Sequence, residues 1–369
     1  MLLVWIALGS AILFFVQRSI YSKYWDQKLR IDFQFSENAV NEGEAAGILE
    51  RSVNRKILPL ASYEYQYVVK RNYSASQKKI DRNNMMLRRK LALPARRAVT
   101  NRAKLNGLTR GVYTVSEVKL SAWDLFHSLH MERTTDCFTT MTVYPAKIPV
   151  QKLSLPVRMM LGSITTRRMA QEDPFALKAI RPYEIYDSPR LINWKASART
   201  GELKVNQFEY STDEALLFLL DMGNGSEADK EEMLRLASSL SQLFLRRGVG
   251  VSLLANGRNC ISGLPIRVRF GANPEHRFTV DSALAQINLE TPETESFRSF
   301  LAAVPTEALR GALPVAISAD PSGEALRAFQ ETPGTKGGYF LSVNGQGRTS
   351  NADGVHLLNW NAEEKEVRL

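Results

Sequence analysis

Residues 215–221 read Ala-Leu-Leu-Phe-Leu-Leu-Asp, a continuous apolar run that ends in an acid. Apolar residues that do not alternate with polar ones are typical of a strand buried on both faces, as in a parallel sheet covered by helices. Asp221 then stands at the carboxyl end of the predicted strand. The run therefore predicts a helix-covered parallel sheet in the C-terminal part of the chain.

Strand-like and helical segments alternate after this run. Apolar residues at helical spacing predict a helix over 228–247, and Gly248 supplies its stop. Further strands are predicted over 249–255, 313–318 and 355–360, with helices near 293–303 and 322–330. This alternation implies a doubly wound α/β domain over 213–369. Ligands of such folds bind at the carboxyl ends of strands, which points to Asp221 and Asp320.

Residues 22–150 show a different pattern, in which short apolar runs alternate with polar residues. Strands are predicted over 31–35, 63–69, 112–120 and 138–144. Short strands at this spacing, separated by Asn and Gly turns, predict an antiparallel β-sandwich. The intervening residues 151–212 are rich in arginine, and 162–168 are interpreted as a flexible joint. The expected fold class is therefore a multidomain α+β chain.

The first residues predict a transmembrane helix. Residues 2–16 carry no charge, and extension to residue 21 gives roughly 30 Å of helix, which matches a hydrocarbon core. A cleaved signal peptide is the alternative, but nothing basic precedes the apolar run, whereas Arg18, Lys23 and Lys28 follow it. We expect an uncleaved anchor over 1–21. The positive-inside rule then predicts a single-pass protein of the inner (plasma) membrane with cytoplasmic soluble domains.

The net charge of +10 comes from 48 Lys and Arg against 38 Asp and Glu, but it is local. Residues 70–110 hold thirteen basic residues and one acid. A solvated loop or edge hairpin is the plain interpretation. Contact with anionic lipid headgroups is the functional one, and its basic candidates are Arg88, Arg89, Lys90, Arg96 and Arg97. Nucleic-acid binding is disfavoured because Tyr73 is the only aromatic residue of this segment.

Residues 181–199 form the densest cluster of charged and aromatic residues. Planar guanidinium groups pair with carboxylates and stack on tryptophan. The interpretation that we favour from residue types alone is an internal network that ties this segment to the α/β domain. The functional interpretation is a recognition surface for a protein partner. The candidate interaction residues are Arg181, Tyr183, Asp187, Arg190, Trp194, Lys195 and Arg199.

The same segment resembles the bacterial domain-of-unknown-function-58 family, whose members carry Arg-x-Tyr, Gly-Asp and Arg-x-Ile-x-Trp-Lys-x-x-Ala-Arg in this order. Here the last motif spans 190–199, and Tyr186 stands in place of the usual Gly before Asp187. Further stretches resemble the family upstream and downstream: Arg110-Gly111-x-Tyr113, Asp124-x-Phe126, Val143-Tyr144-Pro145 and Gln207-Phe208-Glu209.

The resemblance implies a C-terminal part similar to von Willebrand factor A-type domains. It also implies a role beside AAA+ ATPases of the MoxR type, because genes of this family often neighbour theirs, together with those of other membrane proteins. We therefore expect a membrane-attached scaffold or adaptor with no catalysis of its own, and no binding of nucleic acid.

The resemblance further implies where a metal would bind. A-type domains bind Mg²⁺ through Asp-x-Ser-x-Ser, a set of oxygen ligands that suits a hard cation. Here the run is Asp221-Met222-Gly223-Asn224-Gly225, so glycine replaces both hydroxyl ligands. We expect no cofactor, with Asp221 capping a helix or pairing with an arginine. The alternative function is a metal-dependent adhesion-type or hydrolytic domain that uses Asp221 and Asp320.

Other chemistry finds little support in the sequence. His127, His130 and Cys137 have the types of zinc ligands but no fourth ligand at suitable spacing. Cys260 has no recognisable partner for nucleophilic catalysis, and no glycine-rich phosphate-binding motif appears.

Overall fold

The structure is a computed structural model that describes residues 2–72, 84–170, 177–183, 192–208, 215–289, 295–344, 354–362 and 366–368. Its chain falls into two compact units. The first comprises 1–147 with 258–264 and 281–292, and the second comprises 148–257, 265–280 and 293–369.

The elements of the first part of the chain are α1 (Leu2–Tyr24), β1 (Leu29–Phe35), β2 (Ala39–Asn41), β3 (Ala46–Asn54), β4 (Leu60–Asn72), β5 (Met85–Leu93), β6 (Ala98–Leu105), β7 (Gly111–Trp123) and β8 (His130–Tyr144). Those that follow, up to the apolar run, are η1 (Val150–Leu153), α2 (Ser154–Ala170), β9 (Leu177–Pro182), α3 (Trp194–Thr200) and β10 (Lys204–Phe208).

The remaining elements are β11 (Ala215–Leu220), α4 (Glu227–Leu245), β12 (Gly250–Arg258), β13 (Pro265–Gly271), α5 (His276–Ala285), α6 (Phe297–Ala302), α7 (Thr306–Arg310), β14 (Leu313–Ser318), α8 (Glu324–Glu331), β15 (Tyr339–Val343), β16 (His356–Asn361) and β17 (Glu366–Arg368).

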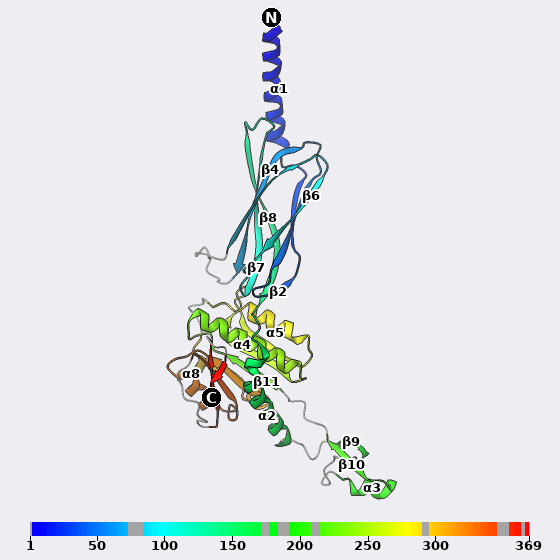
Figure 1. Ribbon diagram of the computed structural model, residues 1–369, viewed down its shortest axis with the longest axis vertical. Coiled ribbons are helices and arrows are strands. Elements are labelled where there is room, and N and C mark those ends of the chain that lie inside the picture. The colour runs from blue at the N-terminus through cyan, green and yellow to red at the C-terminus, as the bar shows by residue number, and fades with distance from the viewer. Residues whose placement is uncertain are drawn as a thin grey trace. The chain divides into compact units, whose positions relative to one another are not determined.

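Helix α1 is long and apolar enough to cross a membrane. Its first part is exposed, but Gln17 and Tyr21 are buried, as is Trp25 directly after the helix. Gln17 and Tyr21 lie four residues apart and therefore share one face, which packs against one end of the sandwich (Figure 1). The prediction of an N-terminal apolar helix is confirmed.

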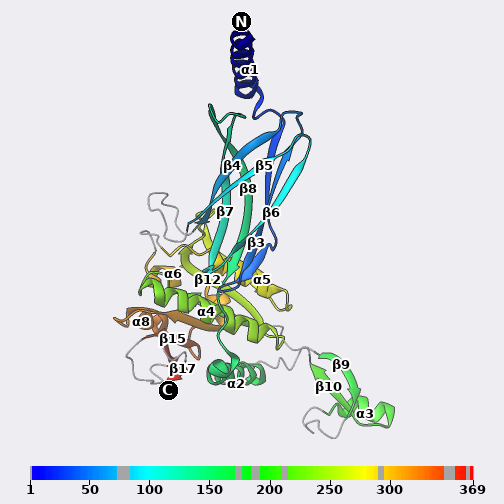
Figure 2. The same ribbon diagram turned by 45° about the horizontal axis from the view of Figure 1, so that its top comes forward.

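The β-sandwich consists of two sheets whose inner faces share one core (Figure 2). One sheet has the order β1-β3-β6 and the other β2-β8-β7-β4-β5. Neighbouring strands are antiparallel, except that β2 runs parallel to β8. The four predicted strands are confirmed as β1, β4, β7 and β8, because polar and apolar residues alternate in them.

The described part of the basic segment forms two edge strands rather than a loop, so the predicted edge position is confirmed. Residues 85–93 and 98–105 form β5 and β6, which belong to different sheets and stand last in the order of each. Long cationic side chains are common on edge strands because they hinder pairing with another chain. Residues 73–83 of this segment lie outside the described residues.

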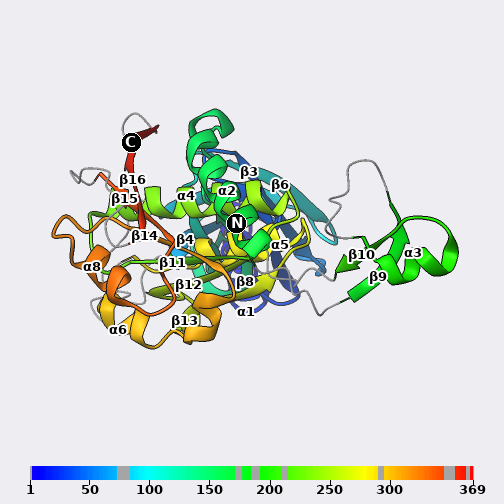
Figure 3. The ribbon, with the colours of Figure 1, turned by 90° about the horizontal axis from the view of Figure 1, so that it is seen from below.

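The second unit contains a sheet of order β13-β12-β11-β14-β15-β16-β17. Strands β12, β11, β14, β15 and β16 pair in parallel, and β17 is antiparallel to β16. Helices cover both faces, with α4 on one side of the strands and α6 and α8 on the other (Figure 3). The mixed α/β expectation is confirmed at this level, and β11, α4 and β14 lie within a residue or two of their predicted bounds.

Burial in β11 explains its continuous apolar sequence. Leu217 and Leu219 pack with the side of the sheet that holds Phe297 of α6 and Phe329 of α8. The alternate residue Phe218 points to the opposite face and is fully buried as well. A strand with both faces covered needs apolar residues throughout.

The joint predicted over 162–168 is wrong. These residues continue helix α2, which runs from Ser154 to Ala170. Gly162 has open space beside it, so it breaks no packing and costs the helix only about 1 kcal/mol relative to alanine.

Candidate functional site

The candidate site lies at the carboxyl ends of β11 and β14. The chain leaves β11 toward α4, on one face of the sheet, and leaves β14 toward α8, on the other face. The two strands are neighbours, so this is the point where the connections diverge and where ligands of open α/β sheets bind. Asp221 and Asp320 follow these two strands, as predicted.

Asp221 is fully buried, and both of its carboxylate oxygens accept hydrogen bonds. Oδ1 accepts from the backbone N–H of Gly223 at 3.1 Å and from Nδ2 of Asn256 at 3.2 Å. Oδ2 accepts from Ser318 Oγ at 2.7 Å and from Asn224 Nδ2 at 3.2 Å. The carboxylate therefore fixes the loop that follows β11 to the ends of β12 and β14. Its partners are amides and a hydroxyl rather than the arginine or helix end that the sequence suggested.

Asn256 completes this network from β12. Its Oδ1 accepts from the backbone N–H of Met222 at 2.6 Å, and its Nδ2 also donates to the Glu295 carbonyl at 3.0 Å. Sequence reasoning missed Asn256 and Ser318. The available signal was a polar residue inside an apolar strand, since buried polar groups are nearly always hydrogen-bonded.

Asp320 serves the start of helix α8. Its carboxylate accepts from the N–H and Oγ of Ser322 and from the N–H of Ala325, all within 2.8 Å. Burial alone would raise the pKa of this carboxyl, but these hydrogen bonds lower it below its ordinary value. The backbone N–H of Asp320 donates to Ser318 Oγ at 3.1 Å, so Ser318 links the two acids.

These contacts do not fit an A-type magnesium site. Gly225 has φ +88°, and a Cβ there would lie 2.6 Å from the Cβ of Ala319, so the second hydroxyl ligand of the pattern has no room. Among the residues that the structure describes, no group of three or more His, Cys, Asp or Glu could hold a metal ion. The network holds the loop in shape, and its hydrogen bonds already engage both carboxylate oxygens of Asp221.

Within residues 177–183 and 192–208, which carry most of the family motifs, β9, α3 and β10 form a small module, called the signature module. β9 and β10 pair antiparallel, and the backbone N–H of Tyr183 donates to the Leu203 carbonyl at 2.9 Å. Asn193 caps α3 by accepting from the N–H of Ala196, and Gly201 ends the helix at φ +74°. A helix this short is unstable alone, so these caps and its link to β10 hold it.

The side chains of Trp194, Lys195 and Arg199 are exposed on α3, and 69% of Trp194 is accessible. None of the hydrogen bonds that fix α3 uses them. The backbone of Arg181 lies in β9 opposite Val205, but its side chain is outside the described part of the molecule, as are Asp187 and Arg190.

The basic candidates divide into two groups. Arg88 forms an ion pair with Glu64, Arg89 lies 3.6 Å from the buried Glu50, and the Lys90 ammonium stands 5.2 Å from the ring centre of Trp123. Arg96 and Arg97 instead lie exposed in the turn between β5 and β6. The structure therefore gives Arg88, Arg89 and Lys90 partners within the sandwich.

The structure places the candidate zinc ligands without a common centre. The rings of His127 and His130 both stack on Trp123, with centres 6.1 and 4.3 Å from that of the indole. Cys137 lies further along β8. Burial and the nearby carboxylates of Asp136 and Glu117 raise the pKa of its thiol to about 11, so it is a poor nucleophile near neutral pH.

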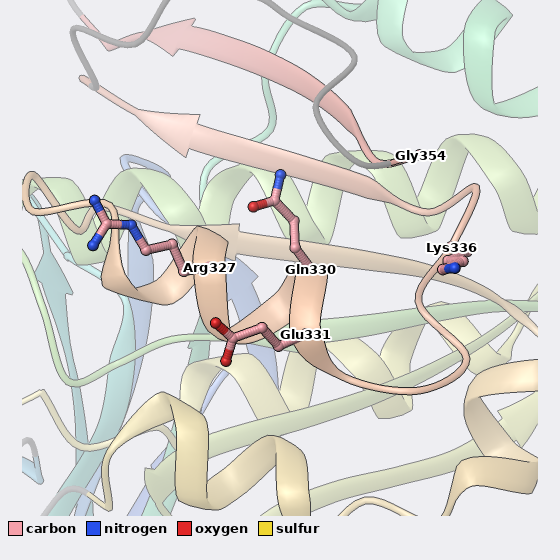
Figure 4. Close-up of a pocket in the computed structure, with 5 residues that line it drawn as sticks. All are labelled: Arg327, Gln330, Glu331, Lys336 and Gly354. Atoms are coloured by element: carbon pink, nitrogen blue, oxygen red, sulfur yellow. The ribbon is translucent and has the colours of Figure 1, made fainter.

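One pocket of the second unit lies beside α8 and is lined by Arg327, Gln330, Glu331, Lys336 and Gly354 (Figure 4). Arg327 and Lys336 stand at opposite ends of this group. Glu331 pairs with Arg298 at 2.6 Å. The lining contains neither Asp221 nor Asp320, and its side chains do not converge on one point.

Residues 179–317 match the family model described as protein of unknown function DUF58. The match begins inside β9 and ends in β14, so it includes most of the signature module and Asp221. The resemblance to domain-of-unknown-function-58 is confirmed over these residues. A comparison with curated proteins finds no match.

Solved structures with similarity to parts of the chain include three proteins. The CARDB domain of the PF1109 protein from Pyrococcus furiosus is 9% identical over 32% of this chain and 90% of that one, with TM-score 0.22. The sporulation control protein Spo0M from Bacillus subtilis is 11% identical over 42% and 58%, with TM-score 0.22. The E. coli curli protein CsgC is 14% identical over 29% and 96%, with TM-score 0.18.

Proposed function

We propose that this chain is a membrane-anchored protein-interaction adaptor, and that its partner is an AAA+ ATPase of the MoxR type. The observation that carries the proposal is the exposure of Trp194 on a helix that does not need this side chain for its own stability. Tryptophan, tyrosine and arginine concentrate binding energy at protein interfaces. Lys195 and Arg199 lie on the same helix and add exposed positive charge to it.

Other apolar side chains of the module support this proposal. Ile180 of β9 and Leu203, just before β10, are each nearly half exposed. With Trp194 this small module therefore exposes three large apolar side chains, and exposed apolar surface is typical of interaction sites. The choice of an ATPase as partner comes from the family resemblance, whose match covers this module.

The catalytic alternative depends on Asp221 and Asp320. Their place at the strand ends favours it, but their hydrogen bonds to the chain's own loops favour the adaptor. In our proposal residues 213–369 form a von Willebrand factor A-like domain whose metal site has become a structural network. The order of the parallel strands and the helices on both faces are compatible with this assignment.

We further propose that α1 anchors the protein in the inner membrane with its soluble domains in the cytoplasm. The length and apolar sequence of α1 support the anchor. The basic residues Arg18, Lys23 and Lys28, which all follow the apolar run, support the orientation.

The variant Trp194→Ala tests the adaptor function. We expect the affinity for the MoxR-type ATPase of the same genome to fall by about 30-fold, which corresponds to a typical hot-spot loss of about 2 kcal/mol. The free energy of unfolding should change by less than about 0.5 kcal/mol because the side chain is exposed. Co-purification from detergent extracts and titration of the purified ATPase give the two affinities.

Trp5→Ala is the matched control, since Trp5 of α1 is 67% exposed and should not affect ATPase binding. Unchanged binding together with unchanged stability in Trp194→Ala would contradict the adaptor role of this surface. Stoichiometric Mg²⁺ or Mn²⁺ in the purified protein, lost in Asp221→Ala, would support the alternative instead.

A further inference from the structure

One end of the sandwich gathers the start of β1 and three connections. The strand registers place them together: Leu60 of β4 pairs with Leu93 of β5, and Trp123 at the end of β7 pairs with His130 at the start of β8. Residues 55–59, 94–97 and 124–129 make these connections. We call them the anchor-end loops.

Helix α1 is fixed rigidly to this end. Gln17 Nε2 donates to Asp124 Oδ2 at 2.7 Å, and Tyr21 Oη donates to the Pro59 carbonyl at 2.8 Å. Asp124 also accepts from Ser128 and from two backbone N–H groups of its loop. Burial would raise the pKa of this carboxyl, but the hydrogen bonds lower it to about 2, so it stays charged and bonded.

The anchor-end loops expose large apolar side chains beside the helix. Phe126 and Leu125 are each more than half exposed, and Ile57 is 73% exposed. The ring of Phe126 contacts that of Phe14, with centroids 5.7 Å apart. Phe14 belongs to the uncharged run of α1, so Phe126 reaches past Gln17 to the depth of the apolar segment.

Basic residues surround these apolar side chains. The exposed cations in α1, in the segment before β1 and in the anchor-end loops are Arg18, Lys23, Lys28, Arg55, Arg96 and Arg97. The acids of the same stretches are Asp26, which pairs with Arg133 at 3.0 Å, and Asp124, which is buried. The exposed charge of this end is therefore positive, which complements anionic lipid headgroups.

The length of α1 gives a physical reason for this arrangement. Its uncharged part, residues 2–16, measures roughly 22 Å, whereas a hydrocarbon core measures about 30 Å. From Gln17 onward the helix packs on the sandwich and offers no free apolar surface on that side. Apolar loops beside the helix would supply the missing hydrophobic depth.

We propose that the anchor-end loops form a lipid-binding collar, in which Leu125, Phe126 and Ile57 insert into an anionic bilayer beside α1. Arg55, Arg96 and Arg97 contact the lipid phosphates at the rim. The proposal rests on the membrane anchoring described under the proposed function, but it does not depend on the ATPase partner. The occupant of this surface is the bilayer itself.

Nitroxide labels on single cysteines test the collar in the full chain. The background carries Cys137→Ser and Cys260→Ser, and the protein is reconstituted in vesicles of phosphatidylcholine and phosphatidylglycerol. We expect the label of Phe126→Cys to be several-fold more accessible to oxygen, which concentrates in lipid, than to a water-soluble nickel chelate. The label of Phe138→Cys is the matched control, since Phe138 is 82% exposed on the same sandwich in β8 and should favour the chelate.

A label at Leu8→Cys in the exposed part of α1 separates this proposal from the anchoring itself. Lipid contact at Leu8 with water contact at Phe126 would overturn the collar alone. Water contact at Leu8 would overturn the anchor as well. A Phe126 label shielded from both reagents would show that protein covers this surface, and it would also overturn the collar.

The charged rim has its own test. Arg96→Glu with Arg97→Glu should move the Phe126 label toward water in vesicles that contain phosphatidylglycerol, and much less in pure phosphatidylcholine. Lys104→Glu, at an exposed position near the other end of β6, is the matched control and should leave the label unchanged. An equal effect of both variants, or no effect of either, would overturn the role of the rim.

Discussion

Asp221 shows how a residue at the ligand-binding position of a fold can serve the chain itself. Its place after β11 was predicted from an apolar run that ends in an acid. Its partners were not, because Asn256 and Ser318 come from strands that only the sheet order brings together. A local pattern predicts where a strand ends, whereas long-range hydrogen bonds depend on which strands become neighbours.

Asp221→Asn should therefore destabilise the protein. An amide in place of the carboxylate turns one acceptor into a donor that faces the donors of Asn224, Asn256 or Ser318. We expect a loss of about 2 to 4 kcal/mol in the free energy of unfolding, since hydrogen bonds to a buried charged group are among the strongest. Urea unfolding of the full chain in detergent measures this.

The exposed Glu275→Gln is the control and should stay within about 0.5 kcal/mol of the original protein. Excess Mg²⁺ should shift neither transition, because a ligand stabilises only the state that binds it. Stabilisation of the original protein by Mg²⁺, absent in Asp221→Asn, would show that the carboxylate serves a metal.

The buried Lys56 should make the stability of the protein depend on pH. Its side chain is buried in an anchor-end loop, and within the described residues its Nζ has no hydrogen-bond partner. Burial lowers the pKa of this ammonium to about 8, although the carboxylate of Asp26 opposes the change. The unfolded chain keeps a pKa near 10.4, so between about pH 8 and 10 the unfolded state binds more protons and stability rises with pH.

Lys56→Met should remove this rise and stabilise the protein at pH 7, where the original must bury a charge or release its proton. Unfolding in detergent at a series of pH values measures both effects as the difference between the two proteins. A parallel pH dependence in the two proteins would contradict our assignment to Lys56.

At the scale of elements, strong local patterns predicted best. β11, α4 and β14 were predicted because each combines a clear period with a clear end. β13 was missed, although Ile266 and Val268 alternate with arginines in its sequence. Residues 162–168 of α2 were predicted as a joint because the arginine-rich sequence around them has little periodicity, but the helix continues through them to Ala170.

Helix α3 should lose local stability when its N-cap is removed. Asn193→Ala removes the acceptor for the N–H of Ala196 and should cost about 1 kcal/mol of local stability. Amide exchange of residues 194–200 should quicken while exchange in α4 stays unchanged. Lys195→Ala, an exposed position in the same helix, is the control, and equal exchange in both variants would contradict the capping role.

At the scale of the molecule, the compact units do not follow the order of the chain. The first unit contains the sandwich together with 258–264 and 281–292. Arg110 explains part of this, because its fully buried guanidinium donates through Nη1 to the carbonyls of Leu284, Ala285 and Ile287 at 3.0 to 3.1 Å. Sequence patterns place Arg110 in a motif, but they do not predict which residues about 175 positions away accept its hydrogen bonds.

Arg110→Met tests this connection in two contexts. In the full chain the variant leaves three carbonyl groups without their donor, and we expect it to cost about 3 to 5 kcal/mol. In a fragment of residues 1–150 these three carbonyls are absent, so the variant should cost at least about 1 kcal/mol less there than in the full chain. The cost differs between chain and fragment only if the segment 281–292 completes the sandwich unit. Urea unfolding of the four proteins in the same detergent measures it, with Arg102→Met at an exposed position of β6 as control. An equal loss in chain and fragment would mean that Arg110 stabilises the sandwich by contacts of its own, and that 281–292 contributes nothing to it.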